Sequence, residues 1–146
     1  MLISDLANSG SNPALEHLIR FAGQRQRLIA SNIANISTPN YRMRDVSVSD
    51  FQANLAAAID QRREETGGER GELDWSETSE LRKDGHGNLV LRAGTPSGNI
   101  LFHDRNNRDL ERLMQASAEN VGVFRVATDL LKKNGDLLRA AITQRP

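Results

Sequence analysis

The chain carries three histidines, His17, His86 and His103, whose imidazoles could bind a metal ion or transfer protons. A metal site needs several ligands brought to one point, and these three lie far apart in the sequence. The segment from Asp84 to Asn88 places His86 between two glycines, which predicts a turn, and it lacks the ligand pattern of a calcium loop. The spacing therefore predicts no metal site.

No other set of residues has the spacing of a catalytic site. No serine stands in a nucleophile elbow, and the chain has no cysteine that could serve as a nucleophile or a thiolate ligand. Gly67, Gly68 and Gly71 lie in a charged segment and do not join a strand to a helix, as a phosphate-binding loop requires. We interpret the carboxylates between residues 64 and 80 as solvated charge. We therefore expect a protein that is not an enzyme and uses no cofactor or small-molecule substrate.

The composition favours a chain that completes its core with a partner. Hydrophobic residues make up 38% of the 146 and aromatic residues 4%, so aliphatic helix faces must replace the usual aromatic anchors. Nineteen basic and nineteen acidic residues balance, which disfavours the one-signed surface of a nucleic-acid-binding protein. The first ten residues lack the basic and apolar regions of a cleaved signal peptide. No apolar stretch approaches the roughly 20 residues that span a membrane.

A long helix is predicted from about Pro13 to Ile36. Asn12 is a suitable N-cap, and Pro13 suits the first helical turn. The helix should end in a Ser-Thr-Pro-Asn turn, because Pro39 disfavours helical geometry in the residue before it and Asn40 tolerates a left-handed conformation. The apolar residues recur at helical spacing and form one stripe of Leu15, Leu18, Ile19, Ala22, Ile29, Ile33 and Ile36.

The middle of the chain is more polar and has shorter elements. An extended stretch follows over residues 41–48, and Ser49 with Gln52 matches a capping box for a helix from about Asp50 to Arg63. Residues 61–84 combine dense charge with three glycines, which predicts a flexible linker or an exposed loop. Two strands of a hairpin are then predicted, at residues 88–92 and 99–103.

The C-terminal helix, predicted from about Asn107 to Thr143, has the clearest pattern. Its apolar residues repeat at alternating steps of four and three over nearly five heptads, which is typical of a coiled-coil seam. Gly135 should weaken the helix by about 1 kcal/mol, so a bend or a close helix contact is expected there. The seam positions are Leu110, Met114, Ser117, Val121, Phe124, Thr128, Leu131, Gly135, Leu138 and Ile142.

These elements predict a mainly α fold in which the long terminal helices pack as a coiled-coil-like bundle. Residues 1–60 hold the N-terminal helix, the turn and the second helix, and residues 61–103 form a partly flexible middle with the β-hairpin. Residues 104–146 hold the C-terminal helix, which joins the N-terminal segment in one core domain. This helix is the longer of the two, so part of its apolar seam lacks an intrachain partner, which usually marks an interaction surface.

The segment from Arg25 to Val46 reads RQRLIASNIANISTPNYRMRDV. It resembles the flagellar rod and hook axial proteins, and the proximal-rod members most closely, whose N-terminal helix ends in a motif close to LASNIANxxTPGYKxxD. Asn106 and Asn107, before the C-terminal seam, are also similar to that family. Asn40 replaces the usual turn glycine. The motif is matched by Leu28, Ala30, Ser31, Asn32, Ile33, Ala34, Asn35, Thr38, Pro39, Tyr41 and Asp45.

The resemblance implies a structural subunit of the proximal rod of the bacterial flagellar basal body, which polymerises through its terminal helices and transmits torque. It implies contacts with other copies of the chain, with the rod proteins FlgC, FlgF and FlgG, with FliE and with the flagellar export apparatus. It also implies a place in the periplasm-spanning rod after export without a cleaved signal peptide. The alternative is a cytosolic coiled-coil adaptor or an export-chaperone-like binding module, which the motif disfavours.

Two polar residues of the motif, Asn32 and Asn35, lie beside the apolar stripe. They could face solvent, or they could bond across a helix interface and fix its register, as single polar residues do in coiled coils. Tyr41 could fill a subunit interface or pack within its own chain. The predicted assembly interface comprises Leu18, Ile29, Asn32, Ile33, Asn35, Thr38, Pro39, Tyr41, Leu110, Met114, Val121, Phe124, Leu131 and Leu138.

Overall fold

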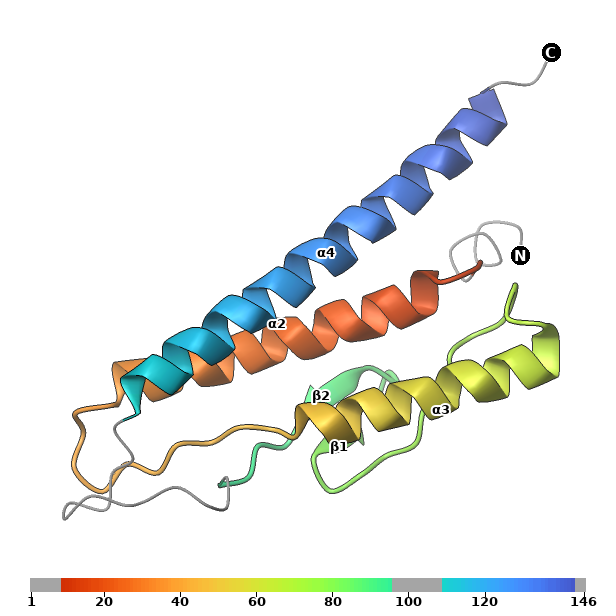
Figure 1. The fold of residues 1–146 in the computed structure, drawn as a ribbon. Coiled ribbons are helices and arrows are strands. Elements are labelled where there is room, and N and C mark those ends of the chain that lie inside the picture. Colours follow the sequence, from red (N-terminus) through yellow and green to blue (C-terminus); the bar gives the residue numbers. More distant parts are fainter. Residues whose placement is uncertain (1–8, 96–108, 144–146) are drawn as a thin grey trace.

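A computed structural model describes residues 9–95 and 109–143. In chain order these residues form α2 (Asn12–Ala34), α3 (Val48–Thr66), β1 (Leu81–Lys83), β2 (Leu89–Leu91) and α4 (Leu110–Thr143). Helix α2 lies in the middle, with α4 along one side and α3 with the two strands on the other (Figure 1). The predicted fold class, mainly α with long terminal helices and a small β-hairpin, is confirmed.

Helix α2 begins one residue earlier and ends two residues earlier than predicted. Ser11 occupies the N-cap position without a side-chain hydrogen bond to the helix, and Asn12 is already helical, so Asn12 is not the cap. At the other end Asn35 is the C-cap, and its N–H donates to the carbonyl of Ser31 at 3.1 Å. Asn40 has a φ of 59°, which confirms the left-handed turn residue predicted there.

Helix α3 is longer than predicted and has a different cap. The hydroxyl of Ser47, rather than that of Ser49, accepts the backbone N–H of Asp50 at 3.2 Å. The helix continues past residue 63 and ends before Gly67, whose φ of 72° lets its N–H donate to the carbonyl of Arg63 at 3.0 Å. The boundary expected at residue 60 therefore falls inside a helix.

The hairpin pairs different strands from those predicted. Strand β2 lies within the predicted segment 88–92, but its partner is the preceding β1, with Leu81 opposite Leu91 in antiparallel register. The other predicted strand, residues 99–103, lies outside the described residues. The predicted turn between Asp84 and Asn88 is confirmed. The Asp84 carboxylate accepts the backbone N–H groups of Asn88 and His86, each at 2.8 Å, and these bonds lower the pKa of this carboxyl.

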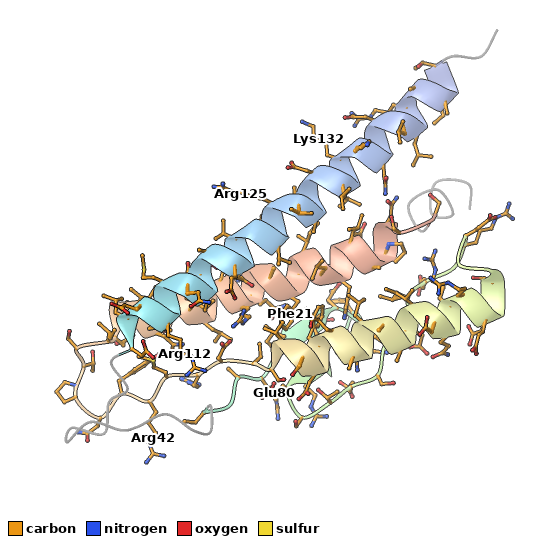
Figure 2. The ribbon with its side chains drawn as sticks, in the orientation of Figure 1. Phe21, Arg42, Glu80, Arg112, Arg125 and Lys132 are labelled. Carbon is orange, nitrogen blue, oxygen red and sulfur yellow. The ribbon has the colours of Figure 1, made fainter. Side chains whose placement is uncertain are left out.

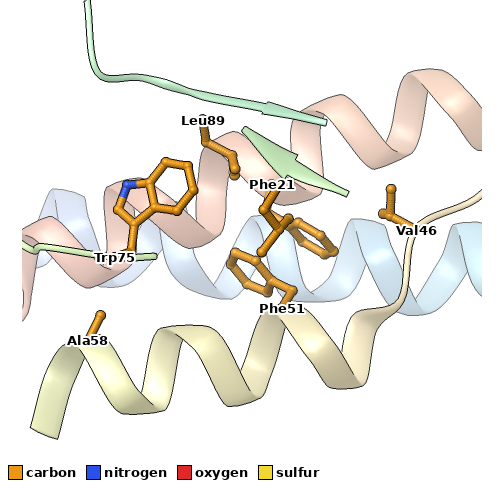
Figure 3. Packing of buried hydrophobic residues seen from close by; sticks show 7 residues of the cluster. Phe21, Val46, Phe51, Ala58, Trp75 and Leu89 are labelled. Atoms are coloured by element: carbon orange, nitrogen blue, oxygen red, sulfur yellow. The ribbon is translucent and has the colours of Figure 1, made fainter. Parts of the chain in front are cut away.

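The hydrophobic core lies between α2, α3 and the hairpin. Phe21 and Phe51 stack with their ring centroids 3.7 Å apart, and Figure 3 shows Trp75 and Leu89 beside them. Trp75 is 5% exposed and Leu81 is 1% exposed, although both belong to the segment predicted as a flexible linker or exposed loop. That prediction is wrong for these two residues, because this segment supplies part of the core.

The buried guanidinium of Arg62 ties the end of α3 to the start of α2. Its Nη1 donates to the carbonyl of Gly10 at 2.5 Å, and its Nε donates to the carbonyls of Arg70 and Gly71 at 3.2 and 3.0 Å. The N–H of Gly10 donates to the carbonyl of Glu69 at 3.1 Å. Charge-assisted bonds of this kind are stronger than neutral ones, so this cluster anchors the loop after α3 to the residues that lead into α2.

Candidate assembly interface

The chain that returns from the turn after α2 is held by the side chain of Asn32, which is 2% exposed. Its Nδ2 donates to the carbonyl of Arg44 at 2.7 Å, and its Oδ1 accepts the backbone N–H of Arg44 at 3.0 Å. The same Oδ1 accepts the hydroxyl of Tyr41 at 3.0 Å. Asn32 therefore does not face solvent. Its amide bonds both the N–H and the carbonyl of one residue, and so joins the helix to the returning chain. Tyr41 packs within its own chain.

An ion pair extends this contact one residue further along the returning chain. Arg25 donates from Nε to Asp45 Oδ1 at 3.0 Å and from Nη2 to Asp45 Oδ2 at 2.8 Å. The backbone of Asp45 forms an isolated antiparallel bridge with Gly94, with N–H to carbonyl distances of 3.1 and 3.2 Å. A bidentate arginine–carboxylate pair fixes geometry as well as charge. The motif thus joins α2 to two distant segments of the chain.

The tip of the turn is exposed and is shaped by Asn35. Its Nδ2 donates to the carbonyl of Ser31 at 2.9 Å, and its Oδ1 accepts the hydroxyl of Thr38 at 3.3 Å. Pro39 lies at the exposed tip, and Arg42 points outward from the returning chain (Figure 2). Asn32, in the buried part of the motif, stabilises the fold of the subunit, whereas Pro39 at the tip of the turn is exposed to solvent.

Helices α2 and α4 pack antiparallel through a line of polar contacts. Asn120 Nδ2 donates to the carbonyl of Ala22 and to Gln26 Oε1, both at 2.8 Å. Gln26 Nε2 in turn donates to the hydroxyl of Ser117 at 2.8 Å. Near the start of α2, Asn134 Nδ2 donates to the side chains of Ser11 and Asn12 at 3.2 and 2.9 Å. Hydrogen bonds at such spacing specify one register for the two helices.

The face that α4 turns to α2 differs from the predicted seam at alternate positions. Asn120 is 4% exposed and Ala127 is 1% exposed, whereas the expected neighbours Val121 and Thr128 lie to one side of the contact line. The predicted positions Ser117, Leu131 and Leu138 are retained. The residues of this contact line are all buried or half-buried, and successive members are three, four or seven positions apart. They are Leu113, Ser117, Asn120, Ala127, Leu131, Asn134 and Leu138.

A first apolar surface of α4 is exposed on one flank of this contact line. Val123, Val126, Leu130 and Leu137 follow one another at helical spacing and are 44%, 60%, 45% and 60% exposed; we call them the valine–leucine face. Glu119 stands one turn before Val123 on this flank, where it lines a depression together with Arg25 and Asn32. An exposed apolar row of this length on a helix usually marks an interaction site.

A second apolar surface lies on the opposite flank, where α2 and α4 form a groove of about 300 Å³. Leu110 and Met114, 47% and 56% exposed, continue the apolar surface toward the start of α4. Arg125 and Lys132 point away from α2, on the side of α4 opposite the contact line (Figure 2). We call the hollow the α2–α4 groove; it is lined by Gly23, Gln26, Arg27, Ala30, Asn120, Val121 and Phe124.

The residues of the predicted interface divide into two groups. Leu18 packs against the core cluster, and Ile29 is 1% exposed, so these side chains, like Asn32, serve the subunit interior. Half-buried positions are Ile33, Asn35, Tyr41, Val121, Leu131 and Leu138, and exposed positions are Thr38, Pro39, Leu110, Met114 and Phe124. The predictions did not include Asn120, Asn134, Val123 or Val126. The asparagines interrupt the apolar pattern, and the valines stand outside the single seam that the heptads suggested.

His17 is a buried histidine that belongs to the core rather than to a metal site. Its ring lies 5.5 Å from that of Phe51 and 4.8 Å from that of Trp75, and its Nε2 has no hydrogen-bond partner within residues 9–95 and 109–143. Burial, together with the positive charges of Arg20 and Lys83, lowers the pKa of His17 from its usual 6.5 to about 4. Across the described ranges, no group of histidines and carboxylates could hold a metal ion, and none of the described helices is long and apolar enough to span a membrane.

Comparison with known proteins finds a match that includes Asn32 and the turn after α2. A family model described as "Flagella basal body rod protein" matches residues 22–42. The flagellar basal body rod protein FlgB of Bacillus subtilis is 29% identical over 136 residues, which cover 92% of this chain and 95% of that protein. The FlgB protein of Salmonella typhimurium is 42% identical over 53 residues, 36% of each chain. The chain is therefore similar to flagellar basal body rod proteins.

This similarity supports a structural role in the flagellar basal body rod, and it does not favour the adaptor alternative. The matched residues 22–42 cover the part of α2 that carries Gln26 and Asn32, together with the exposed turn. The family motif therefore coincides with the residues that bond α2 to α4 and to the returning chain. It includes both the inner residues that fix this geometry and the outer residues at the tip of the turn.

Proposed function

We propose that this chain is a proximal-rod subunit that polymerises through its terminal helices and transmits torque. The observation that carries the proposal is the pair of apolar surfaces on α4, which lie on opposite flanks of one rigid helix pair. A subunit with different contact surfaces on its two sides makes heterologous contacts, and such contacts extend into rings or helical tubes. A helix pair with a fixed register also suits a shaft, because slippage between α2 and α4 would break buried hydrogen bonds.

The exposed length of α4 supports the same proposal. Asn134 bonds the first residue of α2, so the last nine residues of α4, 135–143, extend beyond that helix. At about 1.5 Å per residue this overhang is roughly 13 Å long. It carries Leu137, Leu138 and Ile142, of which Leu137 and Ile142 are each 60% exposed. Neighbouring subunits would cover these side chains in a rod.

The partners of the proposed subunit are other copies of the chain, the rod proteins FlgC, FlgF and FlgG, and FliE at its base. The same proposal includes export through the flagellar export apparatus without a cleaved signal peptide and a final place in the periplasm-spanning rod. Arg42 and Pro39, which face outward at the turn, are available for contacts with such neighbours.

Gene deletion in the source organism tests the proposed function. We expect cells without the gene to lack hooks and filaments and to regain them with a plasmid copy. Electron microscopy of basal bodies extracted from the deletion strain should show rings without a rod. Complete rods in the deletion strain would contradict the proposal and would favour an accessory role.

A further inference from the structure

We propose that the valine–leucine face of one copy docks into the α2–α4 groove of a second copy, with Glu119 of the first beside Arg27 of the second. This inference rests on the proposed function, because it names the surfaces through which copies of the chain would meet. It commits to a parallel side-by-side arrangement of two helix pairs at the same axial level. The two surfaces lie on opposite flanks of α4, so one copy can use both at once.

The α2–α4 groove is an apolar hollow that a side chain of another subunit could fill. It is floored by Gly23 and Ala30 on α2 and walled by Val121 and Phe124 on α4. Gly23 costs the middle of a helix about 1 kcal/mol relative to alanine. A Cβ built on it would lie 3.8 Å from Phe124 Cε2, an ordinary contact, so packing inside the subunit does not require a glycine. A close approach by another chain is a physical reason for a glycine at such a position.

The valine–leucine face has the complementary shape. Its four side chains are branched, apolar and at least 44% exposed, and no partner covers them in the described part of the chain. Rows of such side chains on one helix insert between the side chains of another helix at 8–10 Å separation. The groove offers small residues at Gly23 and Ala30, seven positions apart on α2, where such an insertion can occur.

The register of the helix pair fixes which residues meet. Gln26 bonds Asn120, and Gly23 lies against Phe124. Because the two helices are antiparallel, an α2 residue and an α4 residue at the same height along the pair have residue numbers that add up to about 146. A second copy placed alongside at the same level therefore brings its Val123 to Gly23 and its Glu119 to Arg27. The first contact joins an apolar side chain to the floor of the groove, and the second joins opposite charges at its rim.

The charges support this pairing. Arg27 is exposed on the rim of the groove and has no ion-pair partner among the residues described. Glu119, on the other flank, accepts a hydrogen bond from the neutral Gln115 Nε2 at 2.8 Å and has no ion-pair partner in the described part of the chain. Opposite charges at the edge of an apolar contact fix register and orientation more than they add affinity. An unpaired cation on one surface and an unpaired anion on the other therefore favour a second copy as the occupant.

Cysteine cross-linking tests the proposal directly, because the chain has no cysteine of its own. Arg27→Cys and Glu119→Cys chains would be co-expressed, and extracted basal bodies would be oxidised and run on non-reducing gels. We expect a disulfide dimer only when both chains are present. The control pair, Arg27→Cys with Lys132→Cys, should give none, since Lys132 points away from α2 (Figure 2). Rods that contain both variants without a dimer, or a dimer from Glu119→Cys alone, would overturn the proposal and leave the rod assignment intact.

A second variant keeps the proposal testable if the cysteines disturb assembly. Gly23→Leu fills the groove and should abolish motility, while the purified subunit melts at or above the wild-type temperature because leucine favours helix more than glycine does. Ala118→Leu, exposed on α4 and away from both surfaces, is the matched control and should leave motility normal. Normal motility with Gly23→Leu would overturn the proposed contact. Absence of the wild-type chain from basal bodies would instead count against the proposed function.

Discussion

Asn32 and Arg44 are joined by two hydrogen bonds, from Asn32 Nδ2 to the Arg44 carbonyl at 2.7 Å and from the Arg44 N–H to Asn32 Oδ1 at 3.0 Å. The pair closes a loop with eleven residues between its ends, 33–43, around the exposed turn. Asn32 is almost fully buried, so its amide makes both bonds away from solvent. This relationship explains in physical terms why an asparagine stands at this point of the family motif.

Replacement of Asn32 by alanine should destabilise the subunit more than the same change at Asn35. Each buried polar group left without a partner costs about 1–3 kcal/mol, so we expect Asn32→Ala to lower the free energy of unfolding by about 2–4 kcal/mol. Among the residues described, the Asn35 side chain bonds to Ser31 and Thr38 within its own turn, and Asn35→Ala should cost about 1 kcal/mol or less. Urea denaturation of both purified variants measures the difference. Equal losses would contradict the bonding role assigned to Asn32.

Two neighbouring arginines on α3 should respond very differently to substitution. Arg62→Ala removes bonds to three backbone carbonyls and should cost about 2–3 kcal/mol. Arg63 and Asp60 form an ion pair whose side chains are 69% and 68% exposed, so Arg63→Ala should change stability by less than about 0.5 kcal/mol. Thermal melts of the two variants give the comparison. A larger loss for Arg63→Ala would refute this account of the α3 end.

The stability of the subunit should fall between pH 6.5 and pH 4. The pKa of His17 is lowered to about 4 in the folded chain, so the unfolded chain binds a proton first as the pH falls. The contribution of neutral His17 is therefore fully present above pH 6.5 and is lost as the pH falls through 4. It should amount to about 2–3 kcal/mol. Denaturation of wild type and His17→Phe across this range measures it.

Wild type should lose stability over this pH range more steeply than His17→Phe. His86→Gln, which changes an exposed turn residue, is the control and should behave as wild type. Arg20 and Lys83 are the charged groups that face His17. Parallel pH profiles for wild type and His17→Phe would mean that His17 is not the responsible group.

Exposed and inward-facing residues of α4 should separate assembly from folding. Val126 is 60% exposed, so Val126→Asp should leave the unfolding free energy within about 0.5 kcal/mol of wild type and still abolish motility. Leu131→Asp places a charge in the half-buried contact with α2 and should reduce both the unfolding free energy and motility. Ala118→Asp on the outward side is the control. Motile cells that carry Val126→Asp would argue against the valine–leucine face as an assembly surface.

The sequence predicted the elements whose signals are local. The Pro39–Asn40 turn, the two long terminal helices and the Asp84 turn depend on conformational preferences of single residues or on strong periodicity, and the structure confirms each. Ser47 replaced Ser49 as the cap of α3 because both hydroxyls are equally suitable, and the entry of the chain into the helix decides between them.

Features that depend on distant contacts could not be predicted. Asn120, Ala127 and Asn134 form the line of α4 closest to α2, but a small residue between two polar ones gives no hydrophobic signal. Trp75 and Leu81 lie in a charged segment, and only the position of α3 shows that they are buried. Asn32 was singled out by the motif, yet its partner is the backbone of Arg44, and no side-chain pattern could reveal that.

Quantitative mass spectrometry of hook–basal bodies, extracted with detergent from the source organism, tests the central claim most directly. The account predicts that this chain is enriched in the purified particles and is present at low copy relative to the distal-rod protein, as expected for a proximal-rod subunit. Absence of the chain from intact basal bodies, together with its abundance in the cytosol, would contradict the proposed function.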